Sequence, residues 1–374
     1  MPNATIDEGR PIRFGVIGCG TIAEHRHIPT LIELPGAELV ALADPRTDQL
    51  ERLSRKFQID AVYANYHELL ARDDIDAVTV ATPVGAHAPV VLDCARARKH
   101  VFCEKPPADD EAAAERMYKA MLRAGRLLAF NLEARFRSDS QTIRRWLAEG
   151  RIGRPRYWRF IHNWRGGRWA GIDRYRNLIG PGMGPIVDCG IHDFDLLLWL
   201  SNADVVDLTA QGIWMEGYEN PDHVVATCRL SDGGLAVIDH SWVYGHRSEE
   251  PVVRKCIEIE GTDGLIVSEG DTCTLYAPNG TVREHVENER PFPQIYSAFI
   301  TKLRQVAAAD LGLHAVTIPA DKAVAARDLP VGEQGIRALR LSLRALRCAT
   351  ESSRTGREVA AADESTSLST AAAQ

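Results

Sequence analysis

The chain has 374 residues, of which 45% are hydrophobic and 25% charged, and its formal net charge is −7. This length predicts two domains in an ordinary globular protein, while the acidic balance argues against a nucleic-acid partner and no apolar run reaches the length of a membrane span. Eight cysteines without a C-x-x-C pair indicate reduced thiols in a cytoplasmic protein rather than a disulfide framework or zinc site.

The first informative stretch is an apolar run, Phe14 to Ile17, followed by Gly18, Gly20 and Ala23 at G-x-G-x-x-A spacing. The run predicts a buried strand. Gly18 then permits a tight turn, Gly20 lets a pyrophosphate approach the backbone, and Ala23 lets the following helix pack closely. That helix is expected from Thr21 to Leu34, so Thr21 and Ile22 lie at its N-terminus, where unpaired N–H groups attract phosphates. By itself the motif is equally compatible with an ordinary Gly-rich turn.

A second predicted strand, Glu38 to Ala43, ends at Asp44, 21 residues after Ala23. The dinucleotide fold places its ribose-binding acid at about this distance. A carboxylate there accepts hydrogen bonds from the adenosine ribose and repels a 2′-phosphate, which favours NAD over NADP. Arg46, two residues later, could bind a 2′-phosphate, so NADP is also compatible with this sequence. The alternative without a functional role is that Asp44 only forms the turn before Pro45.

Predicted strands and helices continue to alternate through residue 134. Further strands are expected at 61–63, 77–81, 100–103 and 127–130, with helices at 49–57, 67–71, from 87, and at 108–124. Such alternation predicts a doubly wound parallel sheet, in which ligands bind beyond the carboxyl ends of the strands. Residues 1–134 are therefore predicted to form an α/β Rossmann domain that binds NAD(P).

The pattern changes in the remainder of the chain, residues 135–358. Helices are expected at 140–149, 186–200, 294–309 and 333–350, and strands at 156–164, 205–213, 223–230, 234–244, 253–259, 264–267 and 272–276. Turn signals between several of these strands indicate antiparallel connections, hence an α+β domain. The Ala/Ser/Thr-rich residues 359–374 are expected to be a disordered tail.

Four stretches, at 18–23, 81–87, 103–106 and 184–195, together resemble the Gfo/Idh/MocA family of nicotinamide-dependent oxidoreductases. The Glu-Lys-Pro element at 104–106 and the D-x-x-x-H pattern at 188–192 are more specific than the glycines. The resemblance implies a Rossmann domain followed by a domain with a large, open, mostly antiparallel sheet, through which such proteins associate as homodimers or homotetramers. It also implies that further residues hold the cofactor, namely Thr82, Pro83, His87, Glu104 and Lys105.

A catalytic set can be argued from the residues themselves. Asp188, His192 and Asp195 are spaced i, i+4 and i+7, so one continuous helix would place them on one face. Imidazole is suited to proton transfer at neutral pH, so His192 can take a hydroxyl proton. Asp188 can orient it or bind a substrate hydroxyl, and Lys105 can stabilise a developing alkoxide. The resemblance implies about the same roles for Lys105, Asp188 and His192. Asp195 could orient His192 or be a plain helix-face carboxylate. Asp188 and His192 alone do not make a metal site, and none is expected.

The region from Arg154 to Arg176 holds seven arginines in 23 positions with aromatic residues interleaved. Because guanidinium groups recognise carboxylates and phosphates, one hypothesis is a sugar or polyol substrate with an anionic group, contacted by Trp164 and Arg165. The alternative is packing, since one face of a predicted strand carries Trp158, Phe160, His162 and Trp164.

Taken together, the residues and the resemblance predict an NAD(P)-dependent oxidoreductase that acts on a secondary hydroxyl or keto carbon of a sugar, sugar derivative or cyclitol. NAD is the expected cofactor, with NADP possible. Two alternatives stay open: a redox-neutral glycosidase or epimerase that uses a retained NAD transiently, and a non-catalytic regulator that senses a nucleotide.

Overall fold

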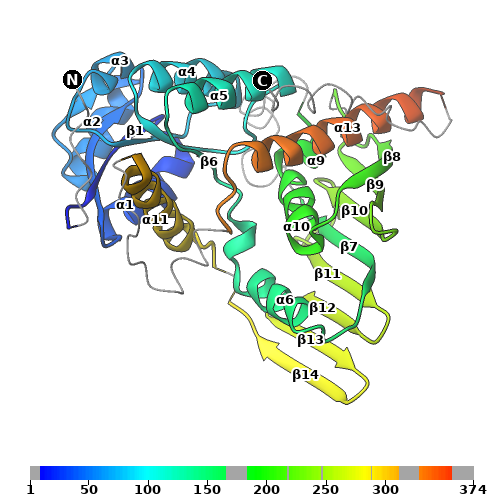
Figure 1. Cartoon of the computed structure of the whole chain (residues 1–374). Coiled ribbons are helices and arrows are strands. Elements are labelled where there is room, and N and C mark those ends of the chain that lie inside the picture. Colours follow the sequence, from blue (N-terminus) through cyan, green and yellow to red (C-terminus); the bar gives the residue numbers. More distant parts are fainter. Residues whose placement is uncertain are drawn as a thin grey trace, which may run out of the picture. The chain divides into compact units, whose positions relative to one another are not determined.

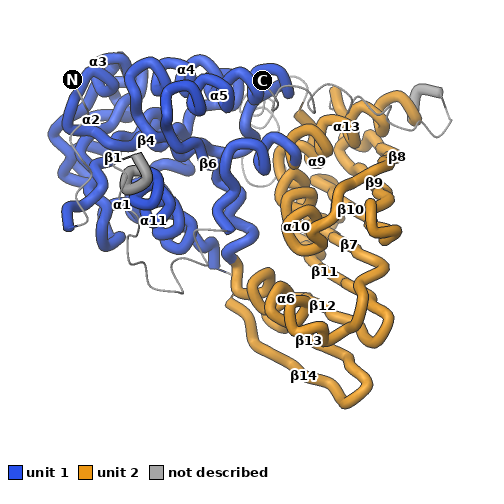
Figure 2. Tube along the Cα trace, in the orientation of Figure 1, with its two compact units in different colours: residues 1–136, 289–337 blue, residues 137–288, 338–374 orange. Residues whose placement is uncertain are grey.

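The computed structural model describes residues 9–165, 183–216, 219–245, 247–287, 289–310 and 328–355. The chain divides into two compact units, shown in Figure 2. Unit 1 is built from residues 1–136 and 289–337, and unit 2 from residues 137–288 and 338–374.

Unit 1 contains a parallel sheet of six strands in the order β3-β2-β1-β4-β5-β6 (Figure 1). The strands are β1 Ile12–Ile17, β2 Ala37–Ala43, β3 Val62–Tyr63, β4 Ala77–Val80, β5 His100–Cys103 and β6 Leu128–Phe130. β4, β5 and β6 are buried at every position, as near-continuous apolar runs are when helices cover both faces of a sheet. The predicted doubly wound α/β domain is confirmed. The order in which successive strands are added to the sheet reverses between β1 and β4, and ligands bind at such a switch point.

The helices of unit 1 connect these strands. They are α1 Ile28–Glu33, α2 Thr47–Phe57, α3 Tyr66–Leu70, α4 His87–Arg96 and α5 Glu111–Arg123, with short 3₁₀ turns at Val84–Ala86 and Glu133–Phe136. The helix expected from Thr21 to Leu34 is interrupted, because a π-helical turn at Ala23–His27 precedes α1. Pro29, which has no N–H to donate, is accommodated in the first turn of α1.

A later helix, α11 (Phe292–Asp310), packs into the core of unit 1. Its Tyr296 ring lies 5.9 Å from that of Phe14, and its Phe299 ring 6.1 Å. The sequence places this helix in one continuous second domain, 135–358, and did not foresee its return to the first sheet. The apolar stripe shows that the helix buries one face, but it does not show against which sheet.

Unit 2 contains a sheet of eight strands in the order β14-β13-β12-β11-β7-β10-β9-β8. The strands are β7 Pro155–Asn163, β8 Val205–Ile213, β9 His223–Leu230, β10 Leu235–Ser241, β11 Arg254–Gly261, β12 Leu265–Glu269, β13 Thr272–Ala277 and β14 Gly280–His285. Every neighbouring pair is antiparallel except β7 and β10. The helices are α6 Ser138–Ala148, α9 Pro185–Asp188, α10 Ile191–Ser201 and α13 Glu333–Thr355, of which α13 begins in the segment of unit 1. The expected mostly antiparallel sheet is confirmed.

The two faces of this sheet differ in character. On one face Trp158, Phe160, Ile238 and Ile259 are buried, and α6, α9 and α10 contact these strands. We call it the helix-side face. The opposite, open face carries polar pairs such as Arg159 with Glu258 and His223 with Asp239. The tail predicted at 359–374 lies outside the described residues.

Candidate functional site

The glycine motif forms a tight turn at the end of β1. Gly18 has φ +95°, and a Cβ on it would lie 2.6 Å from the backbone carbonyl carbon of Ala81, so only glycine fits. A Cβ on Gly20 would meet no atom within 4 Å, so the backbone there is open to a ligand. This is the division of roles that the motif predicts for a phosphate-binding loop.

Asp44 lies at the end of β2 beside this loop. Its carboxylate accepts hydrogen bonds from the Cys19 N–H at 2.8 Å and from two nitrogens of the Arg46 guanidinium at 2.9 Å each. Burial by itself would raise the pKa of Asp44, but the bonds from Arg46 and Cys19 outweigh it and hold that pKa below its usual value. Asp44 therefore does more than form a turn, because its hydrogen bond from Cys19 holds a charged carboxylate against the glycine loop.

The turn after β4 contains Thr82, Pro83 and His87. The Thr82 hydroxyl is buried and has no hydrogen-bond partner within the described parts of the chain. His87 is fully enclosed, with Nδ1 2.9 Å from the Pro106 carbonyl and Nε2 2.9 Å from the Thr82 carbonyl. Burial lowers the pKa of His87. His87 therefore lies between the β4 turn and the Glu-Lys-Pro turn, and as a neutral imidazole it donates to one of the two carbonyls, whereas Thr82 keeps a polar atom available for a ligand.

Glu104 follows β5 and holds the turn that carries Lys105. Its carboxylate accepts hydrogen bonds from Asn131 Nδ2 at 2.6 Å, from the Lys105 N–H at 3.0 Å and from His27 Nε2 at 2.8 Å. His27 Nδ1 in turn lies 2.8 Å from the Tyr296 hydroxyl of α11. Burial would raise the pKa of Glu104, but the bonds and charges of its partners lower it to about 2. Glu104 is therefore a buried anion that fixes the turn, and His27, Asn131 and Tyr296 were not recognised from the sequence as its supports.

The D-x-x-x-H pattern spans a break between two helices, so the expectation of one continuous helix over 186–200 is wrong. α9 ends at Asp188, and the His192 N–H donates to the Cys189 carbonyl at 3.1 Å. The Gly190 N–H donates to the Pro185 carbonyl at 3.0 Å, and a Cβ on Gly190 would lie 2.6 Å from the Ile186 carbonyl oxygen. A side chain at Gly190 would therefore clash with the preceding turn. Cys189 and Gly190 both keep right-handed helical backbone angles across the break, and the placement of Asp188 beside His192 stays a prediction. Asp195 is fully buried in α10.

Below α10, one row of polar side chains crosses the helix-side face of unit 2. Lys255 on β11, His162 on β7 and His240 on β10 are register partners on three adjacent strands. His240 Nδ1 lies 3.2 Å from a carboxylate oxygen of Asp193, and the two imidazole rings lie 4.9 Å apart. We call Lys255, His162 and His240 the polar row. No sequence signal identified it, because it exists only through the pairing of distant strands.

The histidines of the polar row are suited to contact a polar ligand. Burial, followed by the nearby His240, lowers the pKa of His162 to about 3, so this imidazole is neutral at ordinary pH. The Nε2 atom of His240 is buried and lacks a hydrogen-bond partner among residues that the structure describes. His162, Asp193 and His240 each place a metal-ligating type of atom within 4.8 Å of the others, a set that the sequence did not suggest.

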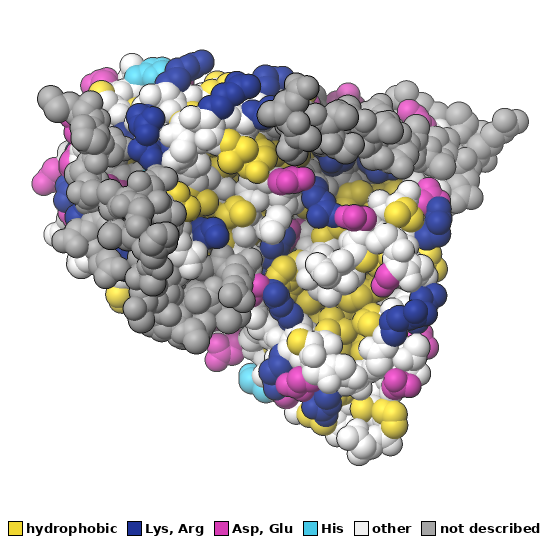
Figure 3. Space-filling view, viewed as in Figure 1, with side chains coloured by type: hydrophobic (Ala, Val, Ile, Leu, Met, Phe, Trp, Pro, Cys, Tyr) yellow, Lys and Arg dark blue, Asp and Glu magenta, His cyan; other side chains and the backbone are white. Residues whose placement is uncertain are grey.

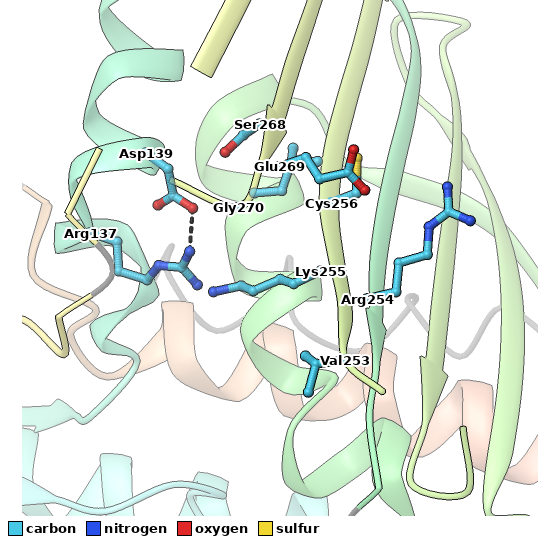
Figure 4. A pocket seen from close by; sticks show the side chains of 10 residues that line it. Arg137, Asp139, Val253, Arg254, Lys255, Cys256, Ser268, Glu269 and Gly270 are labelled. Atoms are coloured by element: carbon cyan, nitrogen blue, oxygen red, sulfur yellow. Dashed lines mark hydrogen bonds and ion pairs between the residues drawn. The ribbon is translucent and has the colours of Figure 1, made fainter. Parts of the chain in front are cut away.

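A cavity of about 460 Å³ adjoins the polar row (Figure 4). Arg137 and Asp139 at the start of α6, Lys255 on β11 and Ser268 on β12 line it. Figure 4 shows the Lys255 ammonium and the Arg137 guanidinium pointing toward one another, with Arg137 also paired to Asp139.

Part of the arginine-rich stretch makes local contacts. Arg156 donates to the carbonyls of Asp232 and Gly233, and Arg159 pairs with Glu258 on the open face. Arg165 donates to the Ser248 carbonyl at 2.8 Å. The backbone N–H of Trp164 donates to the Ser241 carbonyl at 3.0 Å, but its indole Nε1 is buried and has no hydrogen-bond partner within the described residues. Residues 166–176 lie outside the described residues, so the anion hypothesis for this stretch stays a prediction. Trp158 and Phe160 are core residues, as the packing alternative predicts.

Comparison with known proteins places these features in a family. A family model described as "Oxidoreductase family, NAD-binding Rossmann fold" matches residues 12–132, and one for the GFO/IDH/MocA C-terminal domain matches residues 140–267. The chain is 31% identical to myo-inositol 2-dehydrogenase of Thermotoga maritima over 265 residues, covering 69% of this chain and 75% of the relative. It is 30% identical to 1,5-anhydro-D-fructose reductase of Ensifer adhaerens over 295 residues, which cover 75% of this chain and 82% of that relative.

A solved structure is similar over nearly the whole chain. The WlbA dehydrogenase from Bordetella pertussis, in complex with NADH and UDP-GlcNAcA, superposes with a TM-score of 0.73 at 25% identity, covering 94% of this chain and 98% of that one. Among the helices that the structure describes, none combines the length and apolar character needed to cross a membrane.

Proposed function

Because this chain belongs to the Gfo/Idh/MocA family of NAD(P)-dependent oxidoreductases, we propose that it transfers hydride between nicotinamide and a secondary hydroxyl or keto carbon of a sugar, sugar derivative or cyclitol. The observation that carries the proposal lies in unit 1. The carboxyl ends of β1, β4 and β5 are adjacent in the sheet, so the Gly18 loop and the Glu104-anchored turn of Lys105 lie at one edge. A cationic side chain that could bind a substrate oxygen is thus held beside a phosphate-binding loop.

This edge fits a dinucleotide. The open backbone at Gly20 leaves room for a pyrophosphate, the Asp44 carboxylate lies beside the loop for a ribose, and the Thr82 hydroxyl still has hydrogen-bonding capacity to satisfy. When bound there, the nicotinamide supplies the hydride acceptor or donor. Asp44 favours NAD, while Arg46, whose side chain is 58% exposed, could move to accept a 2′-phosphate.

Proton transfer is assigned to unit 2. His192 lies half-buried in the first turn of α10, directly before Asp193, which binds His240. We assign His192 as the base that takes the hydroxyl proton, Lys105 as the donor that stabilises the resulting alkoxide, and Asp188 as a partner for a neighbouring hydroxyl. The imidazoles of His162 and His240 offer further hydrogen bonds to substrate hydroxyls.

The test is a spectrophotometric screen of cyclitols and sugars with NAD and NADP, starting with myo-inositol. Removing a general base typically costs about 10²–10⁴-fold, so H192A should lower kcat at least about 100-fold with unchanged binding of NAD. H223A is the matched control, because His223 pairs with Asp239 on the open face, and it should stay within about twofold of wild type. Equal turnover by H192A and wild type would show that another group is the base. The comparisons support neither the redox-neutral enzyme nor the non-catalytic regulator.

The open face of unit 2 supports association of identical chains. Several large hydrophobic side chains on this face are 38–55% exposed, namely those of Ile213, Val225, Leu235 and Tyr276. Figure 3 shows one side of the molecule, where hydrophobic side chains gather among charged ones over unit 2. We propose a homodimer or homotetramer formed through this face. Light scattering should give a dimer or larger, and V225K should shift it toward monomer, whereas a wild-type monomer at micromolar concentration would exclude the proposal.

All eight cysteines are free thiols, and seven of them are buried. Unpaired buried thiols are typical of proteins in a reducing compartment, which supports the proposed cytoplasmic location.

A further inference from the structure

We propose that the cavity between Arg137 and Lys255 binds an anionic group of the substrate, a carboxylate or a phosphate, so that the enzyme acts on an acidic sugar or cyclitol. This inference rests on the proposed function and names the substrate class for its site. It differs from the sequence hypothesis, because the cations are not those of the arginine-rich stretch.

The charges inside the cavity do not balance. Register places Lys255 on the helix-side face together with His162, whereas Cys256 and its register partner Glu269 belong to the opposite face. In Figure 4 the side chains of Arg254 and Glu269 accordingly extend away from Arg137. Arg254 and Glu269 nevertheless belong to the cavity lining, so three cations, Arg137, Arg254 and Lys255, line it with two carboxylates, Asp139 and Glu269. Asp139 is the carboxylate on the side of Arg137 and Lys255.

The Asp139 carboxylate already has hydrogen-bond partners on both oxygens. One oxygen of Asp139 pairs with Arg137, and the other accepts the Ser140 N–H at 2.7 Å. Within the described residues, no carboxylate lies at ion-pair distance from the Lys255 ammonium, although it lines a cavity with a guanidinium opposite. Two like charges that face each other repel, so an anion between them would remove a repulsion and gain charge-assisted hydrogen bonds. The N-terminus of α6, an 11-residue helix that begins at Ser138, adds partial positive charge on the same side.

The cavity and the proposed base both lie near His162. Arg137 and His192 each act electrostatically on this imidazole. Adjacent strands are about 4.8 Å apart, which makes the polar row from Lys255 to His240 about 10 Å long. A six-membered ring with one charged substituent spans this length, with the charge at Lys255 and ring hydroxyls at His162 and His240. A cavity of about 460 Å³ is large enough for such a molecule.

The primary test measures anion binding without turnover. The full chain saturated with NAD, which occupies the glycine loop, is titrated calorimetrically with inorganic phosphate. Wild type should bind phosphate, and K255M should bind at least about tenfold more weakly, because it loses a charge-assisted contact. R159M is the matched control, since it removes the same charge from the open face of the neighbouring strand, where Arg159 pairs with Glu258 outside the cavity lining, and it should bind within about twofold of wild type. Thermal melts of both variants verify folding. Absent binding to wild type, or equal binding by K255M, would overturn the inference.

Competition identifies the source of the anion. D-glucuronate and D-glucose 6-phosphate should each be compared with D-glucose as competitors of bound phosphate. Displacement by either acidic sugar at concentrations where glucose has no effect supports the inference and distinguishes carboxylate from phosphate, whereas displacement by glucose equal to both overturns it. Turnover of a neutral cyclitol without phosphate binding would remove the anion site and leave the proposed function standing. The opposite result is a protein that binds phosphate through Lys255 and yet oxidises or reduces no sugar. That result would support the anion site and reject the proposed function.

Discussion

Replacing Glu104 by glutamine tests the buried network that holds the Lys105 turn. Three donors, from His27, Asn131 and the Lys105 backbone, converge on the two carboxylate oxygens. Glutamine has nearly the same shape but only one acceptor oxygen, so its NH₂ group must face at least one donor. E104Q is therefore expected to destabilise unit 1, although the volume of the side chain at position 104 hardly changes.

The expected magnitude follows from the lowered pKa. The fall in the pKa of Glu104 to about 2 corresponds to about 3 kcal/mol of stability at neutral pH, in the range found when one partner of a buried charged pair is removed. Because the pKa is lower in the folded chain than in the unfolded one, this stability is present above about pH 4.5 and is lost as the pH falls toward 2. The difference between wild type and E104Q should thus shrink by about 1 kcal/mol between pH 6 and pH 3.5.

Glu24 provides the matched control. The hydrogen bond from Arg52 lowers the pKa of Glu24 to about 2 as well, but Arg52 and Lys56, its two partners, are about half exposed. Solvent screens such pairs, so E24Q should cost less than about 1 kcal/mol.

The chain offers a clean assay for this comparison. All seven tryptophans belong to unit 2, so urea unfolding followed by tryptophan fluorescence reports unit 2, while hydrogen exchange of peptides from β4, β5 and α11 reports unit 1. E104Q should accelerate exchange in unit 1 by about 100-fold and leave the fluorescence transition nearly unchanged. If E104Q and E24Q had equal effects at pH 7, or if the E104Q effect did not depend on pH, the account of converging donors on a buried anion would be refuted.

Three further predictions concern the cofactor edge and the polar row. G18A should fail to fold or lose several kcal/mol, because its Cβ would clash with the Ala81 backbone, whereas G20A should keep the wild-type melting temperature and bind NAD at least about tenfold more weakly in calorimetry. D44S should raise the affinity for NADP relative to NAD, measured by paired titrations, and an unchanged ratio would remove Asp44 from ribose recognition. H162N should raise KM while leaving the acid limb of the pH–rate profile in place, because the pKa of His162 is about 3; loss of that limb would make His162 the titrating group.

Much of unit 1 could be read from local sequence. Its strands are short and buried on both faces, so apolar runs reveal them directly, and each functional turn follows a strand without interruption. Gly18 could be identified as an obligatory glycine, and Glu104 with Lys105 could be placed at a strand end, because a parallel sheet brings all such ends to one edge. What supports Glu104 could not be foreseen, since Tyr296 approaches it from a helix nearly two hundred residues later in the chain.

Unit 2 shows where local patterns fail. The spacing of Asp188 and His192 predicts one continuous helix, yet a break at Cys189 and Gly190 separates α9 from α10. In the arginine-rich stretch, Arg156 and Arg165 contact backbone carbonyls and Arg159 contacts Glu258, which local spacing does not reveal.

By itself the sequence determined the class of each sheet and the glycine turn after β1, because these depend on neighbours within a few positions. Only the tertiary structure decided which side chains meet. Lys255, His162 and His240 form one row because β11, β7 and β10 pair in a particular register, and a shift of one residue would move them to the opposite face. The register between strands depends on which faces of whole strands are buried. A local sequence motif therefore does not predict the polar row.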